Sequence, residues 1–220
     1  MVVENIKKSY GKKTVLKDIS FSCEKGKCIG ILGGNGSGKS SLLSILAGVL
    51  KADGGRFLKD DTDLLKNSKK RAQTVGYVPQ NTPLFDELSA KDNLRLWYDK
   101  KSMEKSLSCG VLSMLGINEF INIPVSKMSG GMKKRLSIGC AVAQNPEILL
   151  LDEPSAALDL VCKEKISEYL KDFKKNGGIV ILATHDIQEL PLCDKLYIIK
   201  DGCLTEYIYD GDIKRLAGSL

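Results

Sequence analysis

The stretch Gly33-Gly34-Asn35-Gly36-Ser37-Gly38-Lys39-Ser40 fits the pattern G-x-x-x-x-G-K-[ST]. It follows an apolar run over 28–32 and precedes an apolar, helix-forming stretch over 41–46, so it joins a strand to a helix. Glycines let the backbone fold back with its N–H groups pointing inward, and the start of the helix adds a positive dipole. The stretch therefore predicts a cradle for the phosphates of a nucleoside triphosphate, and the alternative is a plain glycine-rich turn.

Two side chains of this loop have roles that follow from their chemistry. We expect Lys39 to reach the β- and γ-phosphates, and the hydroxyl of Ser40 to ligate Mg²⁺. The other residues expected to contact the nucleotide here are Gly33, Gly34, Asn35, Gly36, Ser37, Gly38 and Ser41.

Length and composition predict a single globular domain, or a domain that carries a subdomain. The chain has 220 residues and is 43% hydrophobic, which is ample for a core. No apolar run approaches the roughly 20 residues that a membrane span needs. Seven cysteines, with no C-x-x-C pair, and the lack of a signal peptide predict a reduced, cytosolic protein that is soluble or at most peripheral to a membrane.

The chain is basic, with a net charge of +6 and basic clusters at 69–71, 133–135 and 174–175. We interpret these clusters as solvated helix faces and loops; contact with an acidic membrane surface or with nucleic acid is the alternative. Because no basic stripe is interleaved with aromatic residues and no nucleic-acid motif is present, the sequence predicts no nucleic-acid partner.

Apolar periodicity predicts an α/β core with a helical insert. The short aliphatic runs 147–152 and 179–183 are typical of strands buried on both faces of a parallel sheet. Further strands are expected over 2–21 (two, joined by a turn at 10–13), 27–32, 74–78, 195–200 and 203–209, a turn at 52–55, helices over 126–143 and 158–175, and a short terminal helix. We predict one domain, with 1–85 and 144–220 forming the core and about 86–143 forming the helical subdomain.

An acidic pair, Asp152-Glu153, ends one of the buried strands, where α/β sheets bind ligands. Asp152 is placed to hold the Mg²⁺ shell, and Glu153 to orient and polarise the water that attacks the γ-phosphate. The alternative is a solvated strand end.

Three more residues are candidates because of their position. His185, the only histidine, follows a buried strand and is able to hydrogen-bond the γ-phosphate, although a lone histidine is more often structural. Gln80 follows another strand and is either a loop residue or a ligand of Mg²⁺ or its water. Tyr10 either packs on its strand or stacks on a purine.

A second candidate anion site is the segment Ser129-Gly130-Gly131, which precedes a predicted helix. The alternative is an N-cap serine followed by two flexible glycines. One chain does not need two such helix starts, but they make sense if two chains meet face to face and each completes the other's site.

Together these elements resemble the ATP-binding cassette (ABC) family of ATPases over essentially the whole chain. Gly33–Ser40 resembles the Walker A loop, Met128–Met132 the family signature, and Ile148–Asp152 with Glu153 the Walker B strand with its catalytic glutamate. The remaining matches are Tyr10 (adenine stacking), Gln80 (Q-loop), Ser155–Asp159 (D-loop, with Asp159) and His185 (switch histidine).

The resemblance implies a P-loop NTPase of ABC type, with a mixed, largely parallel core sheet, an antiparallel β subdomain and an inserted helical subdomain. It implies ATP and Mg²⁺ as cofactors, with Ser40, Gln80 and Asp152 on the metal, and two cassettes closing head to tail over ATP, each site completed by the partner's signature segment. It also implies a separate membrane-spanning permease that docks near 81–92, which places the chain at the cytoplasmic face of a membrane.

Two positions depart from the usual family pattern. Met132 replaces the signature glutamine, which is similar to cassettes of ABC-2-type exporters, and Gly34 replaces a frequent proline. Since both hydrolysis residues, Glu153 and His185, are present, we expect an active ATPase. The likeness to ABC-2-type cassettes implies that it powers an exporter, as a homodimer or paired with a second ABC ATPase. The alternatives are a soluble ATPase acting on a protein assembly, such as an iron–sulfur scaffold, and a nucleotide-gated binding module.

Overall fold

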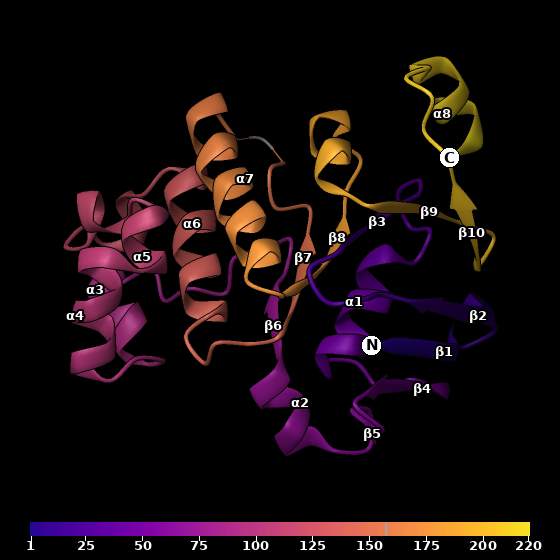
Figure 1. Ribbon diagram of the computed structural model, residues 1–220, viewed down its shortest axis with the longest axis horizontal. Coiled ribbons are helices and arrows are strands. Elements are labelled where there is room, and N and C mark those ends of the chain that lie inside the picture. Colours follow the sequence, from indigo (N-terminus) through magenta and orange to yellow (C-terminus); the bar gives the residue numbers. More distant parts are fainter. Residues whose placement is uncertain (157) are drawn as a thin grey trace.

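A six-stranded sheet forms the centre of the computed structural model, which describes residues 1–156 and 158–220 (Figure 1). Its strand order is β10-β9-β3-β8-β7-β6. All neighbouring strands are parallel except β9 and β10. The strands are β3 (Cys28–Leu32), β6 (Val75–Val78), β7 (Ile148–Asp152), β8 (Ile179–Ala183), β9 (Lys195–Lys200) and β10 (Cys203–Tyr207).

The short aliphatic runs do form the middle of this sheet, as predicted. Every residue of β3, β7 and β8 is buried, because helices and the second sheet cover both faces. Asp152 pairs in register with Ala183, and Ala183 with Ile31, so these three strands end at one edge. Residues that follow them are therefore brought together at that edge.

A second, antiparallel sheet has the order β2-β1-β4-β5. β1 (Val2–Tyr10) and β2 (Lys13–Ser22) meet at the predicted turn, whereas β4 (Gly54–Lys59) and β5 (Thr62–Asp63) were not predicted. The prediction of a turn over 52–55 is wrong for Gly54 and Gly55, which are the first two residues of β4. Gly55 (φ 104°) allows this, because a Cβ there would lie 2.6 Å from backbone oxygens of β1.

Between β6 and β7 the chain forms the helical segment, which gathers on one side of the central sheet (Figure 1). Its helices are α3 (Ala90–Arg95), α4 (Lys100–Cys109), α5 (Val111–Met114) and α6 (Gly130–Ala141), with 3₁₀ turns at Ile117–Phe120 and Val125–Lys127. The prediction of one helix over 126–143 is wrong in detail. Met128 is extended, and Ser129 then caps α6 by accepting a hydrogen bond from the N–H of Met132 at 3.2 Å.

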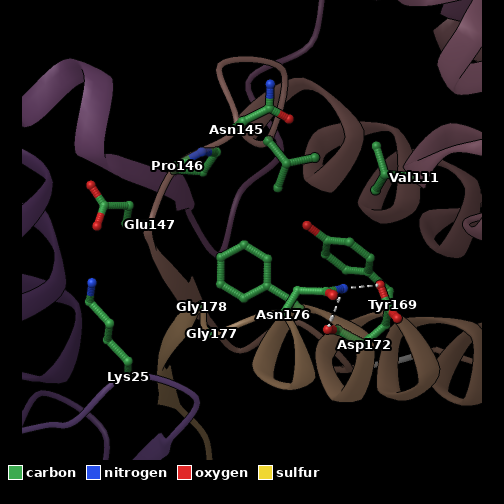
Figure 2. A pocket seen from close by; sticks show the side chains of 12 residues that line it. Lys25, Val111, Asn145, Pro146, Glu147, Tyr169, Asp172, Asn176, Gly177 and Gly178 are labelled. Atoms are coloured by element: carbon green, nitrogen blue, oxygen red, sulfur yellow. Dashed lines mark hydrogen bonds between the residues drawn. The ribbon is translucent and has the colours of Figure 1, made fainter.

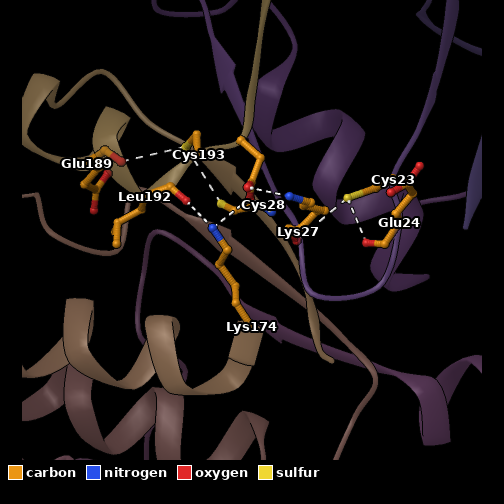
Figure 3. A network of polar contacts seen from close by, with 9 residues as sticks. Cys23, Glu24, Lys27, Cys28, Lys174, Glu189, Leu192 and Cys193 are labelled. Atoms are coloured by element: carbon orange, nitrogen blue, oxygen red, sulfur yellow. Dashed lines mark hydrogen bonds and ion pairs between the residues drawn. The ribbon is translucent and has the colours of Figure 1, made fainter. Parts of the chain in front are cut away.

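The remaining helices cover the sheets: α1 (Lys39–Ala47), α2 (Ser68–Thr74), α7 (Leu160–Lys175), the 3₁₀ helix η3 (Ile187–Leu192) and α8 (Ile213–Ser219). α7 lies beside α6 and begins at Leu160, with Asp159 as its N-cap, two residues later than predicted (Figure 1). Near the other end of α7, Lys174 donates a 2.7 Å hydrogen bond to the carbonyl of Leu192 (Figure 3). Close to this contact, the thiols of Cys28 and Cys193 lie 3.8 Å apart (Figure 3). All seven cysteines are free.

Among the described helices, none combines the length and the apolar character needed to cross a bilayer.

The basic cluster 133–135 was interpreted as solvated. This interpretation is wrong for Lys134 and Arg135, which are buried. Arg135 donates to the carbonyl of Leu115 at 2.9 Å and lies over the ring of Phe120, since α6 is enclosed on several sides by its neighbours.

Candidate nucleotide-binding and hydrolysis site

The phosphate loop joins β3 to α1 at the carboxyl edge of the central sheet. Lys39 folds back over it, and its Nζ donates hydrogen bonds to the carbonyls of Gly33 (2.7 Å) and Gly34 (3.3 Å). Gly38, the N-cap of α1, has φ 113°, and a Cβ there would come within 2.8 Å of Leu16. Since no side chain caps α1, its first N–H groups face the loop and are available to an anion.

Charges are buried beside the loop without complete pairing. Desolvation lowers the pKa of the Lys39 ammonium, against the opposing charges of Glu153 and Asp152. Burial likewise raises the pKa of the Asp152 carboxyl, against the Ser40 hydroxyl and the Lys39 charge. Within the described part of the chain, Asp152 Oδ1 and Ser37 Oγ are buried without a hydrogen-bond partner. The unpartnered Oδ1 of Asp152 and the hydroxyl of Ser40, which lies beside the same carboxyl, are oxygen donors that suit a hard divalent cation.

Glu153 sits at the end of β7 with two polar side chains on its carboxylate. Gln80 Nε2 donates to Glu153 Oε2 at 3.1 Å, and His185 Nδ1 lies 3.0 Å from Glu153 Oε1. The three residues come from the ends of β6, β7 and β8, as the sequence predicts for side chains at one sheet edge. Glu153 has φ 48°, a strained backbone for a non-glycine residue, and its N–H bonds the carbonyl of Ala183 at 2.9 Å.

Tyr10 lies at the end of β1, close to the start of α1. Its ring is 48% exposed, and its hydroxyl lies 3.2 Å from Ser41 Oγ. The ammonium of Lys8 lies 5.5 Å from the ring centroid. An exposed ring anchored beside the phosphate loop is able to stack on a base.

The segment Ser129-Gly130-Gly131 is placed elsewhere, on the helical segment. Both α6 and α1 contact β6, but α6 otherwise packs against α3 and α7, whereas α1 packs against β7 and β8. Ser129 and Gly130 are exposed, and among the described residues no hydrogen bond links this segment to residues 33–40. Of the predicted D-loop, Asp159 caps α7 by accepting from the N–H of Cys162 at 2.9 Å; Ala157 lies outside the described residues.

The sequence did not single out three polar residues near Glu153 and His185: Lys163, Asp186 and Lys134. Lys163 of α7 forms an ion pair with Asp186 at 2.6 Å, and Ser155, the first residue of the predicted D-loop, also donates to Asp186 at 3.2 Å. Lys134 of α6 donates to the carbonyls of Pro79 and Gln80, at 3.0 Å each. No local signal in the sequence distinguishes these lysines from solvated ones, because their partners are distant along the chain.

A hollow of about 460 Å³ lies at the opposite edge of the sheet (Figure 2). Asn145-Pro146-Glu147, before β7, and Asn176-Gly177-Gly178, before β8, line it together with Tyr169 and Phe173 of α7. Ligands of parallel sheets bind at the carboxyl ends of the strands. We therefore assign the nucleotide to the phosphate loop and not to this hollow.

The fold and the site together define a P-loop nucleoside triphosphatase. The sequence profile of the ABC transporter family matches residues 16–156, and the chain belongs to this family. It binds ATP, and the predicted class, an ABC-type ATPase with a helical insert, is confirmed. These matches favour the hypothesis of an ABC transporter ATPase over the two alternatives, a soluble ATPase that acts on a protein assembly and a nucleotide-gated binding module.

Named relatives agree with this class. A linearmycin resistance ATP-binding protein of Bacillus subtilis is 38% identical and aligns with 90% of this chain, which spans 66% of that relative, just under two thirds. A lantibiotic transport ATP-binding protein of Streptococcus pyogenes is 31% identical, with 95% of this chain and 91% of the relative covered. A dimeric ATP-binding cassette in a post-hydrolysis state, bound to ADP and Pi, superposes with a TM-score of 0.82 at 29% identity, covering 96% of this chain and 100% of that one.

Proposed function

We propose that the chain is the ATP-hydrolysing subunit of a membrane exporter, with Glu153 as the residue that activates water. The observation that carries this proposal is the carboxylate of Glu153 at the edge of the sheet, in contact with both Gln80 and His185 and near the buried ammonium of Lys39. A carboxylate held there is able to accept a proton from a water that attacks the γ-phosphate.

The roles of the neighbouring side chains follow from their chemistry. Lys39 exchanges its bonds to the Gly33 and Gly34 carbonyls for phosphate oxygens, and the loop N–H groups bind the same anion. His185 moves from Glu153 to the γ-phosphate, so one carboxylate oxygen becomes free to orient water. Tyr10 stacks on the adenine.

Ser40, Gln80 and Asp152 would hold Mg²⁺. The unpartnered, buried Asp152 Oδ1 supports this assignment. When bound, Mg²⁺ neutralises charge that develops on the transferred phosphoryl group. Glu153 accepts the proton that the attacking water loses, while the bond between the γ-phosphorus and the leaving oxygen of ADP breaks.

A second copy of this chain, or another ABC ATPase, completes the site. Ser129 and Gly130 are exposed at the start of α6, and among the described residues no hydrogen bond links them to the chain's own phosphate loop. The dimeric state of the superposable cassette supports the same arrangement. Each chain then offers Ser129, Gly130 and Gly131 to the nucleotide of its partner, and Asp159 lies near the same interface.

The partner whose transport is powered by ATP hydrolysis is a membrane-spanning permease. A groove of about 590 Å³ is lined by residues of the helical segment, of β6 and of the end of α1. Val49 and Trp97, which are exposed, line it together with Tyr77, Pro83 and Leu84. An amphipathic helix of the permease fits this apolar groove, which directly adjoins Gln80. Docking there places the chain on the cytoplasmic face of the membrane, and the names of the relatives, linearmycin resistance and lantibiotic transport, support export.

The test is Glu153→Gln in the purified chain with Mg²⁺ and ATP. We expect kcat to fall by about 10²- to 10⁴-fold while ATP still binds, because the amide cannot accept the proton. The trapped ATP state should elute as a dimer in size-exclusion chromatography. Glu168→Gln, an exposed change on α7, is the matched control. Hydrolysis at the unmodified rate in Glu153→Gln would overturn the assignment.

A further inference from the structure

Lys134, on α6, is almost entirely buried, with 5% of its surface exposed. Its Nζ lies 3.0 Å from the carbonyl oxygen of Pro79 and 3.0 Å from that of Gln80. Both carbonyls belong to the segment that leaves β6 at the edge of the active site. One ammonium therefore holds two successive peptide groups of another element.

Burying the Lys134 ammonium costs free energy, because the charge loses its contact with water. Among residues 1–156 and 158–220, no carboxylate lies within ion-pair distance of Lys134. Desolvation lowers the pKa of the Lys134 ammonium, although the charges of Asp152, Glu153 and Glu189 oppose this. A leucine or methionine would fill the same space without removing a charge from water. Since packing alone does not require a lysine, the two carbonyl contacts are what the ammonium adds.

The contact joins two parts of the proposed machinery. Lys134 lies five residues after Ser129, about 7.5 Å along the axis of α6, so it moves with the signature segment. At the other end, the side chain of Gln80 donates to Glu153 at 3.1 Å. A path of two polar contacts, Lys134 to the Gln80 carbonyl and the Gln80 side chain to Glu153, therefore runs from α6 to the carboxylate.

We propose that Lys134 is a positioning residue, whose ammonium holds the Pro79 and Gln80 carbonyls so that the Gln80 side chain lies correctly against Glu153. Through this contact the orientation of α6, and hence of its own signature segment, sets the geometry at the hydrolysis site of the same chain. The proposal rests on the proposed function of Glu153, and it adds a residue that acts through another and does not touch the nucleotide.

The first test examines the contact itself in the nucleotide-free chain. A charge-assisted hydrogen bond to a carbonyl polarises its whole peptide group, so the amide ¹⁵N resonances of Gln80 and Asn81 report on the two acceptors. We expect Lys134→Met to shift both resonances upfield, and Lys134→Gln to shift them less. Lys133→Met is the matched control, because Lys133 is the neighbouring residue, 28% exposed and paired with Asp86. Unchanged Gln80 and Asn81 resonances in folded Lys134→Met would overturn the proposal.

The second test is a double-mutant cycle on ATP hydrolysis by the full chain. We expect Lys134→Met to lower kcat by about 10- to 100-fold with KM for ATP changed less than about twofold, the loss typical of a misplaced catalytic contact. In a Gln80→Ala background the same substitution should have no further effect. Independent, multiplying losses would show a structural role and overturn the proposal, as would a kcat equal to that of the unmodified chain.

The variants distinguish a folding defect from a loss of catalytic function. If Lys134→Met does not fold, Lys134→Gln, which keeps one donor group without the charge, is measured in the same cycle and read by the same criteria. Failure of the proposed function would appear as absent hydrolysis in the unmodified chain or full activity in Glu153→Gln. Failure of this inference would leave both of those results as expected.

Discussion

Nδ1 of His185 lies 3.0 Å from Oε1 of Glu153. For a neutral imidazole this contact places the proton on Nδ1 and leaves Nε2 as an acceptor. Glu153 is 11% exposed and His185 57%, so the histidine covers the carboxylate from the solvent side. Both oxygens of the proposed base therefore have a polar partner, His185 on one and Gln80 on the other. We infer that binding of the γ-phosphate must draw His185 away before Glu153 is able to orient water.

His185→Ala should accordingly lower kcat by about 100-fold, the loss expected when one donor to a developing charge is removed. KM for ATP should change little, since the proposed role of His185 involves only the terminal phosphate. Steady-state hydrolysis measures both quantities. A drop in ATP affinity with kcat intact would assign His185 to binding instead. His185 is the only histidine, so its ring protons give one set of NMR signals, and Glu153→Gln should shift them in the nucleotide-free chain.

Tyr10 offers a test of base stacking that separates the ring from its hydroxyl. Tyr10→Ala should weaken ATP binding about 5- to 100-fold, because stacking of one base on an aromatic ring contributes about 1–3 kcal/mol. Tyr10→Phe removes the 3.2 Å contact with Ser41 but keeps the ring, and it should bind ATP normally. Equilibrium titration with a fluorescent ATP analogue gives both affinities. Equal losses in the two variants would indicate that the hydroxyl, and not the ring, is what matters.

The two glycines of the signature segment should respond differently to alanine. A Cβ on Gly131 would lie 2.4 Å from Cys162 Sγ, whereas a Cβ on Gly130 meets nothing closer than Leu158 at 3.9 Å. Gly131→Ala should therefore lower the free energy of unfolding by about 1–3 kcal/mol through overpacking. Gly130→Ala should leave stability unchanged yet reduce hydrolysis, because the added methyl group would face the partner's nucleotide. Urea unfolding and ATPase assays distinguish these outcomes, and normal activity in Gly130→Ala would argue against a site shared between two chains.

Glu189 predicts a pH dependence of stability. It is buried on η3, its Oε2 has no partner among the described residues, and burial raises the pKa of this carboxyl above its ordinary value of 4.5. Between pH 4.5 and that raised pKa the folded chain binds more protons than the unfolded chain, so the stability contributed by the protonated form is lost as the pH rises through this window. Glu189→Gln should remove this loss.

Urea unfolding of both proteins between about pH 5 and 8 measures this effect. The stability of Glu189→Gln relative to the unmodified chain should increase with pH. Glu168→Gln, at an exposed position, should follow the unmodified chain. Parallel curves for Glu189→Gln and the unmodified chain would show that Glu189 has the same pKa in the folded and unfolded states.

Local patterns predicted much of this fold because their signals lie within a few residues. The glycines of 33–38 and the aliphatic runs of β7 and β8 carry their conformations in their own sequence, and the structure confirms them. β4 was missed because its stability comes from pairing with β1, about 50 residues earlier, and not from a strong local pattern; β5, only two residues long, pairs with β4. The helix predicted over 126–143 was interrupted because the Ser129 cap and two glycines favour a new helix start.

The sequence by itself determined the class of protein and most candidate residues of the site, because a phosphate loop and strand-end carboxylates must follow one another at set spacings to act on a nucleotide. Only the tertiary structure decided how those residues meet. It placed the side chains of Gln80 and His185 against the two oxygens of Glu153. It also showed that Lys134, predicted from the sequence to be solvated, is buried and donates a hydrogen bond to the Gln80 carbonyl. The physical reason is that burial and pairing depend on elements distant along the chain: α6 is enclosed by α3, α7 and β6, and no short stretch of sequence records which of its lysines faces them.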